Sequence, residues 1–149
     1  MKYQSLSYSC GPAAIINALR CFGIKKTEKQ ILKISNTSNK IGTSEENMVN
    51  ALTILGFHVI KHEQERLGKA WKWLCNQLSN GRPVIISINN WAHYVTAIGI
   101  IGDRIILFDP YGLGEIANEN GVFVLNKKQL KKKWYHTNKR LYSGLAIDK

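Results

Sequence analysis

Apolar residues recur at helical spacing through the first half of the chain, often behind a residue that can cap a helix. The segment Cys10–Phe22 is mostly apolar, which predicts a helix that is buried on most sides and ends at Gly23. Thr27, followed by Gln30, matches the pattern of a capping box. The further helices expected are one from Thr27, one from Thr43 or Ser44 to Gly56, and one over about 67–78.

The second half of the chain changes to runs of β-branched and aromatic residues, which are typical of strands. After a short strand at 57–60, the strands expected are 83–88, 93–101, 104–109, 122–125 and 141–147, with a short helix over about 127–134. Helices followed by an antiparallel sheet indicate an α+β fold, with a helical N-terminal half packed on a C-terminal sheet. No repeat or linker interrupts this pattern, so residues 1–149 are expected to form a single domain.

Composition narrows the class of protein. Hydrophobic residues occupy 44% of the 149 positions, enough to bury a core without disulfides or metals. The cysteines Cys10, Cys21 and Cys75 are odd in number and widely spaced, which argues against a disulfide framework and leaves a free thiol. They show no paired ligand spacing with the histidines, so no zinc site, other metal or cofactor is predicted.

The sequence also lacks the segments that would place it in a membrane or direct it to export. No apolar run reaches about 18 residues, and the N-terminus has no apolar stretch typical of a signal peptide. We therefore expect no membrane span and a cytoplasmic location.

The chain is strongly basic, with a formal net charge of +11 and a pI of about 9.7. Much of this charge lies in the segment Lys127–Arg140, which contains no acidic residue. A nucleic acid or another anionic surface could bind there. A solvated helix face on a basic protein is the simpler interpretation, with Trp134 and Tyr135 as packing residues rather than base-stacking platforms.

Cys10 is the candidate nucleophile. A thiol attacks as the thiolate, and a helix N-terminus or a nearby imidazolium favours that form. Pro12 is tolerated only in the first turn of a helix, so it places Cys10 at or just before a helix start. Gly11 is expected to leave room for a substrate carbonyl. The alternative is that Cys10 is an ordinary buried thiol, like Cys21 and Cys75.

His93 is the candidate base, and Asp109 is the candidate orienter of its imidazole. His93 begins an apolar strand, whereas His58, His62 and His136 lie among charged residues. Asp109 ends another apolar strand and precedes a proline. Taken singly, His93 would be a structural residue and Asp109 an ordinary turn residue before proline.

The hairpin between these strands determines whether His93 and Asp109 share a face of the sheet. A plain two-residue turn at Gly102-Asp103 would pair Asp109 with Thr96, on the opposite face. An odd-length loop would place Asp109 directly across from His93. We therefore predict an odd loop or a bulge in this hairpin, with Gly102 in the left-handed conformation.

Gln4 is the candidate for stabilising the oxyanion that forms during acyl transfer. A side-chain amide and the backbone N–H of the nucleophile can both donate hydrogen bonds to that oxygen. Losing one such donor typically lowers the rate by about 100- to 1,000-fold. Taken alone, a glutamine this near an N-terminus is usually a surface residue.

These residues belong to an ordered set of motifs that extends from Gln4 to the region of Trp134. In chain order, the motifs are Gln4-x5-Cys10-Gly11-Pro12-Ala13, Gly42-Thr43-Ser44, Leu55-Gly56-Phe57, Pro83-Val84-Ile85, His93-Tyr94-Val95 and Asp109-Pro110. The set closely resembles the bacteriocin-processing (double-glycine leader) peptidase family within the papain-like group. The resemblance implies a papain-like α+β fold, with the roles of nucleophile, general base and acid, orienter and oxyanion donor carried by Cys10, His93, Asp109 and Gln4.

The chain departs from this family at two places. Many members have aspartate just before the cysteine, where this chain has Ser9. Transporter-linked members continue into membrane spans and an ATPase, whereas this sequence stops, so a free-standing peptidase is expected rather than leader processing coupled to export. The Cys-Gly-Ser-Cys-Trp signature of papain itself is absent.

The resemblance implies a cysteine peptidase that hydrolyses a protein or peptide substrate through a thioester acyl-enzyme. The same residues would serve a deamidase, an isopeptidase or an acyltransferase, which the sequence does not separate. A non-catalytic binding module that uses the Lys127–Arg140 segment is a further alternative. Trp91 and Asn89 are expected to line the cleft, although Trp91 would equally suit the core.

Overall fold

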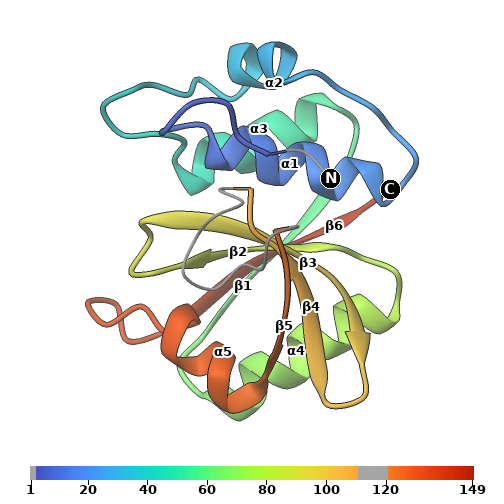
Figure 1. Ribbon diagram of the computed structural model, residues 1–149, viewed down its shortest axis with the longest axis vertical. Helices are drawn as coiled ribbons and strands as arrows, with labels where there is room; N and C mark the ends of the chain where they lie inside the picture. The colour runs from blue at the N-terminus through green and yellow to red at the C-terminus, as the bar shows by residue number, and fades with distance from the viewer. Residues whose placement is uncertain (1–2, 111–120) are drawn as a thin grey trace.

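The computed structural model describes residues 3–110 and 121–149, which form a six-stranded antiparallel sheet with helices on both faces (Figure 1). The helices are α1 (Cys10–Arg20), α2 (Glu28–Ile34), α3 (Glu45–Ile54), α4 (Leu67–Ser79) and α5 (Lys127–Trp134). The strands are β1 (His58–Gln64), β2 (Val84–Ile88), β3 (His93–Ile101), β4 (Arg104–Phe108), β5 (Val122–Asn126) and β6 (Tyr142–Asp148). They lie in the order β1-β6-β2-β3-β4-β5. Within these residues, no helix has both the length and the apolar character needed to cross a bilayer.

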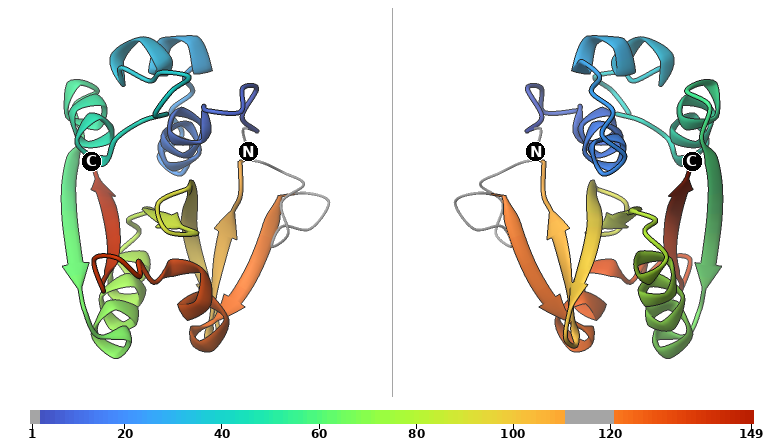
Figure 2. Two further views of the ribbon diagram at one scale, coloured as in Figure 1. Left: turned by 90° about the vertical axis from the view of Figure 1, so that its left-hand side faces the viewer. Right: turned by 90° about the vertical axis from the view of Figure 1, so that its right-hand side faces the viewer.

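The sheet separates two hydrophobic cores. Helices α1, α2 and α3 cover one face of the sheet, and α4 and α5 cover the other (Figures 1 and 2). Successive residues of β2 point to opposite faces, so Ile85 joins the core beneath α1 and Ile86 joins the core against α4. The predicted α+β fold is confirmed. The sequence pattern did not show that α4 lies opposite the first three helices, or that β1 forms an edge of the sheet.

Among the helices that begin at a capping residue are α2 and α3, whose starts were predicted from the sequence. The Thr27 hydroxyl accepts from the Gln30 N–H (3.2 Å), and Gln30 Oε1 accepts from the Thr27 N–H (2.9 Å), so the predicted capping box is confirmed. Of the two residues considered for the next start, Ser44 and not Thr43 is the cap, and it accepts from the Asn47 N–H (3.1 Å). Both starts depend on contacts within a few residues.

A bulge shifts the register of the β3–β4 hairpin. The two strands are joined by the two-residue turn Gly102-Asp103, in which Gly102 is left-handed as predicted (φ 60°). Pairing is regular from this turn to Gly99, but the register shifts before Ala97, which makes Ile98 the extra residue. The predicted bulge is confirmed, and the alternative of an odd-length loop is wrong.

The bulge places His93 and Asp109 on one face of the sheet. Beyond it, Thr96 pairs with Phe108, so Asp109 follows opposite Val95, two residues from His93. Side chains two residues apart on a strand share a face, which makes His93 and Asp109 diagonal neighbours. The expectation that they lie directly across from each other is therefore wrong by two residues.

Candidate active site

Cys10 is the first residue of α1, and its side chain is half-buried. The turn before it is closed by the Ser9 hydroxyl, which donates to the Leu6 carbonyl (3.0 Å) and accepts from the Leu6 N–H (3.1 Å). Pro12 lies in the first turn of α1, where its missing N–H leaves no helical hydrogen bond unmade. Cys10 therefore lies at the positive end of the helix dipole.

Gly11 serves packing rather than substrate access. A Cβ at this position would lie 2.7 Å from Thr43 Oγ1 and 3.0 Å from Met48 Sδ. The space that we expected to receive a substrate carbonyl is thus filled by Thr43 and Met48. The close approach instead holds the start of α1 against the loop that precedes α3.

Two buried hydrogen bonds join the helical layer to β3 beside Cys10. Thr96 Oγ1 donates to the Ala14 carbonyl (3.0 Å), and the Tyr94 hydroxyl donates to the Thr43 carbonyl (3.0 Å). Burial raises the pKa of Tyr94, so its hydroxyl stays protonated and remains a donor. These two bonds set the position of Cys10 relative to the start of β3.

The side chains of His93 and Asp109 are in contact, with His93 Nε2 at 2.5 Å from Asp109 Oδ1. His93 begins β3, and Asp109 directly follows β4. The Asp109 side chain is only 2% exposed. Its backbone N–H donates to the carbonyl of Gly121 (2.9 Å), just before β5, so the carboxylate has a fixed position behind the imidazole.

Cys10 lies near enough to the same imidazole to affect its pKa. Burial lowers the pKa of His93, but hydrogen bonds with Asp109 and Cys10, and attraction to both, outweigh burial and raise this pKa to about 9. Because Asp109 is at Nε2, the Nδ1 atom of the ring is the one left to face another group. The structure thus brings Cys10, His93 and Asp109 together, with His93 an imidazolium at neutral pH.

We expect the contribution of His93 to stability to decrease as the pH rises. Its pKa is raised from 6.5 to about 9 in the folded protein, so the folded state binds this proton more tightly than the unfolded chain. The stabilisation is therefore full below pH 6.5 and is lost as the pH rises through 9. Urea unfolding of wild type and His93→Ala would measure it as a difference in unfolding free energy that shrinks over this range. A difference that stays constant would contradict the raised pKa.

The Gln4 amide, by contrast, has its partners within the N-terminal turn. Its Nε2 donates to the carbonyls of Leu6 (2.7 Å) and Ser7 (3.3 Å). The backbone N–H of Gln4 donates to the Pro110 carbonyl (2.8 Å), which ties residue 4 to the segment after Asp109. Gln4 is thus near the candidate site, but an oxyanion role requires its amide to exchange partners when a substrate binds.

A cleft of about 260 Å³ opens beside Cys10. Its lining includes the 39–43 segment and, directly before His93, Trp91 and Ala92. Ile41 of the 39–43 segment is 75% exposed, so the cleft offers an apolar contact as well as a thiol. Across residues 3–110 and 121–149, no three His, Cys, Asp or Glu side chains gather as metal ligands would.

The turn that carries Trp91 has three successive left-handed residues, Asn89, Asn90 and Trp91, with φ of 54°, 56° and 69°. Backbone strain of this kind persists only where surrounding contacts hold it. The Asn89 N–H donates to the Lys133 carbonyl (2.9 Å), and Asn90 Oδ1 accepts from the N–H (2.9 Å) and hydroxyl (3.0 Å) of Thr137. Trp91 lines the cleft as expected, whereas Asn89 anchors the turn. This turn was not predicted, although the Asn-Asn pair, which tolerates the left-handed conformation, was an available signal in the sequence.

Sequence comparison relates the chain to a family model and to two archaeal proteins. The model of the Peptidase_C39 like family matches residues 1–142. An uncharacterized protein of Methanothermobacter thermautotrophicus is 28% identical over 120 residues, which cover 80% of this chain and 77% of that protein. An uncharacterized protein of Methanothermobacter marburgensis is 26% identical over the same shares of both chains.

Solved peptidase domains have a similar fold. The peptidase domain of Streptococcus ComA, a bi-functional ABC transporter involved in a quorum sensing pathway, has a TM-score of 0.75 at 18% identity, covering 99% of this chain and 96% of that chain. A double glycine motif protease from an AMS/PCAT transporter, solved in complex with the leader peptide, has a TM-score of 0.72 at 17% identity, covering 98% and 88%. At these identities the likeness establishes the fold, and the papain-like arrangement expected from the sequence is confirmed.

Proposed function

This chain belongs to the Peptidase_C39 like family, and we propose that it is a cysteine peptidase that cleaves a peptide substrate with Cys10, His93 and Asp109. One observation carries the proposal: Asp109 contacts His93 at 2.5 Å, and the same imidazole lies near Cys10, which lines a cleft. A nucleophile, a base and an orienting group in this order are what thiol acyl transfer requires. The AMS/PCAT relative was solved with a leader peptide, which supports a peptide substrate here.

The proposed reaction begins from an ion pair between the Cys10 thiolate and the His93 imidazolium. The thiolate attacks the substrate carbonyl, and the imidazolium gives its proton to the departing amine, which leaves a thioester on Cys10. Neutral His93 then takes a proton from water, the hydroxide attacks the thioester, and Cys10 leaves as the thiolate, which restores the ion pair and releases the acid product. Asp109 keeps the ring in position and stabilises its positive charge in both steps.

The oxyanion formed in each attack needs hydrogen-bond donors. The backbone N–H of Cys10 is one proposed donor, because the first N–H groups of a helix have no partner within the helix. The Gln4 amide is the second, once it leaves the carbonyls of Leu6 and Ser7. This exchange assigns Gln4 a role that begins only when substrate occupies the cleft.

Iodoacetamide is expected to alkylate Cys10 at least about tenfold faster than Cys21 or Cys75 at neutral pH. Partial burial raises the pKa of both other thiols, which keeps them protonated, whereas Cys10 lies at the start of a helix and near His93. Mass spectrometry of tryptic fragments over time would measure the three rates. Faster labelling of Cys75 than of Cys10 would overturn the assignment, and His93→Ala should remove the advantage of Cys10.

A pool of synthetic peptides would distinguish peptide cleavage from other acyl transfer. Under the proposal, wild-type protein produces shortened peptides with new termini, and Cys10→Ala produces none. Intact peptides in which a side-chain amide has become an acid would indicate a deamidase instead. Peptides joined to an added amine would indicate an acyltransferase. All these products are separated by mass in one experiment.

A further inference from the structure

A strongly basic surface lies beside the cleft, on α5 and the segment that follows it. We propose that this lysine surface, defined as Lys128, Lys131, Lys132, Lys133 and Lys139, binds an acidic segment of the peptide substrate and so positions the chain in the cleft. The proposal rests on the proposed peptidase function. It adds a class of substrate, namely a polypeptide with a run of aspartate or glutamate near the bond to be cleaved.

Two adjoining hollows, of about 310 and 320 Å³, follow the exposed side of α5. Lysines line both of them, and the sequence from 121 to 147 contains no acidic residue. Within residues 3–110 and 121–149, the ion pairs of lysine are made by Lys61, on β1. The charge of the lysine surface is therefore not neutralised by carboxylates of this part of the chain.

The lysine surface is continuous with the cleft. Thr137 lines the second hollow and hydrogen-bonds Asn90, and the next residue, Trp91, lines the cleft. The Lys139 ammonium lies 5.2 Å from the centre of the Trp91 ring. Figures 1 and 2 show the loop between β2 and β3 lying between the helical layer and the segment that follows α5. A peptide that leaves the cleft past Trp91 thus meets a lysine and then the hollows of α5.

The aromatic residues near this surface favour a polypeptide over a nucleic acid as the ligand. Single-stranded nucleic acids bind through exposed aromatic platforms as well as positive charge. Trp134 is 2% exposed, and Tyr135 packs against Tyr142 with ring centres 5.1 Å apart. The Trp91 ring is flanked by His136, at 5.3 Å between ring centres, and by a lysine ammonium. Lysines without a stacking platform suit carboxylates, which need only charge and hydrogen-bond donors.

Fluorescence anisotropy with the full-length Cys10→Ala protein tests the proposal without requiring turnover. The probes are two labelled peptides of equal length, one with a run of glutamates and one with glutamines at the same positions. The glutamate peptide is expected to bind about tenfold tighter at low salt, from several surface ion pairs, and to lose this advantage at high salt. Adding Lys128→Gln, Lys131→Gln and Lys132→Gln should bring the two affinities together.

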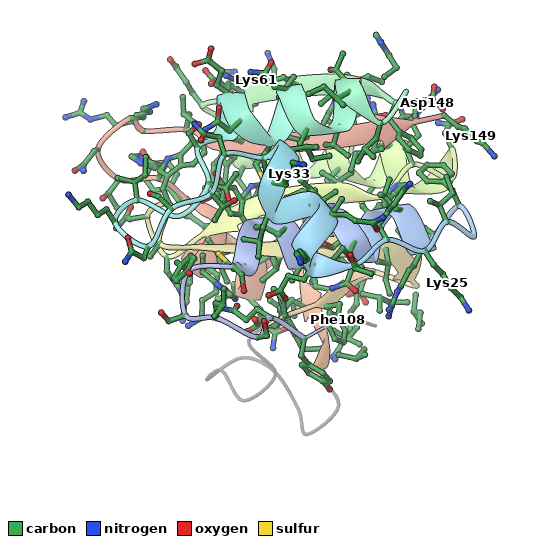
Figure 3. The ribbon with its side chains drawn as sticks, turned by 90° about the horizontal axis from the view of Figure 1, so that it is seen from above. Lys25, Lys33, Lys61, Phe108, Asp148 and Lys149 are labelled. Atoms are coloured by element: carbon green, nitrogen blue, oxygen red, sulfur yellow. The ribbon has the colours of Figure 1, made fainter. Side chains whose placement is uncertain are left out.

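A variant with the same loss of charge elsewhere separates the lysine surface from net charge. Lys25→Gln, Lys29→Gln and Lys33→Gln serve this purpose, because Lys25 and Lys33 lie on the helical side of the molecule, away from α5 (Figure 3). This control should keep the preference for glutamate. Equal binding of the two peptides by the Cys10→Ala protein, or equal losses in both lysine variants, would overturn the proposal.

Two further measurements complete the test. In wild-type protein, the glutamate peptide should slow alkylation of Cys10 by iodoacetamide, because the bound chain extends into the cleft; binding without protection would overturn the role in substrate positioning. An oligothymidylate that binds tighter than the glutamate peptide, and loses affinity in the α5 lysine variant, would show that the ligand of this surface is a nucleic acid and not a peptide. If the proposed peptidase function is wrong, the result is different: the glutamate peptide still binds, but wild-type protein does not cleave peptides and Cys10 is not labelled preferentially.

Discussion

Cys10→Ala and His93→Ala are each expected to lower peptide cleavage by at least about 10⁴-fold while the protein remains folded. The first removes the nucleophile, and the second removes the group that supplies a proton to the departing amine. His93→Ala also leaves the buried Asp109 carboxylate without this partner, so its unfolding temperature should fall. Initial rates of cleavage, measured well below that temperature, with circular dichroism to verify folding, would test both variants.

The matched control for the first variant is Cys75→Ala. Cys75 is also half-buried, and it lies on α4, on the opposite side of the sheet from Cys10. Removing its thiol should leave the rate of cleavage within about twofold of wild type, as expected for a substitution away from the site. A folded Cys10→Ala protein that still cleaves at a rate within tenfold of wild type would end the assignment of Cys10.

Asp109→Asn is expected to have the next largest effect, lowering cleavage by about 10- to 100-fold. The amide oxygen of asparagine can still accept the hydrogen bond from His93 Nε2, so the orientation of the ring is largely kept. The negative charge that raises the pKa of His93 is lost, and this pKa should therefore fall. The decrease in cleavage rate at high pH should then occur at lower pH than in wild type, and the pH dependence of Cys10 alkylation should shift in the same direction.

Asp103→Asn provides the comparison for this prediction. Asp103 is exposed in the turn of the same hairpin, so the substitution removes an equal charge without touching His93. Its rate profile should superpose on that of wild type. An Asp109→Asn profile that also superposes would show that the carboxylate does not act on His93.

The parts of the fold that depend on neighbours in sequence could be predicted. The capping box of Thr27 and Gln30 makes its hydrogen bonds within one turn, so its residue types alone indicate a helix start. Pro12 restricts its own segment in the same way, and α1 does begin at Cys10. The role of Gly11 was misinterpreted because glycine is needed there to avoid a clash with Thr43 and Met48, which are distant in sequence.

The geometry of the candidate site could be predicted only in part. The period of two along a strand showed that a regular hairpin would turn Asp109 away from His93, so some irregularity was required. Its place, at Ile98, was not visible, because either strand or the turn can absorb one residue. The strained turn at Asn89–Trp91 was missed for a related reason: its hydrogen bonds come from Lys133 and Thr137, in a distant segment.

The order of the strands is also a property of long-range packing. β1 comes from the N-terminal half of the chain and pairs with β6, near the C-terminus, at one edge of the sheet. Alternation of apolar residues identifies a strand and its buried face, but it does not select a partner. The sequence therefore predicted the fold class, whereas the pairing needed the structure.

Cys10 belongs to the helical layer, whereas His93 and Asp109 belong to the sheet, and the Thr96 and Tyr94 hydroxyls hold the two layers in register. A nascent or partly unfolded chain, in which α1 has not docked on β3, therefore keeps the proposed nucleophile apart from its base. Under the proposed function, such a chain cannot cut its own exposed segments. Self-digestion would then be restrained during synthesis, and recovery of activity on refolding would report the docking of α1 rather than the formation of either layer.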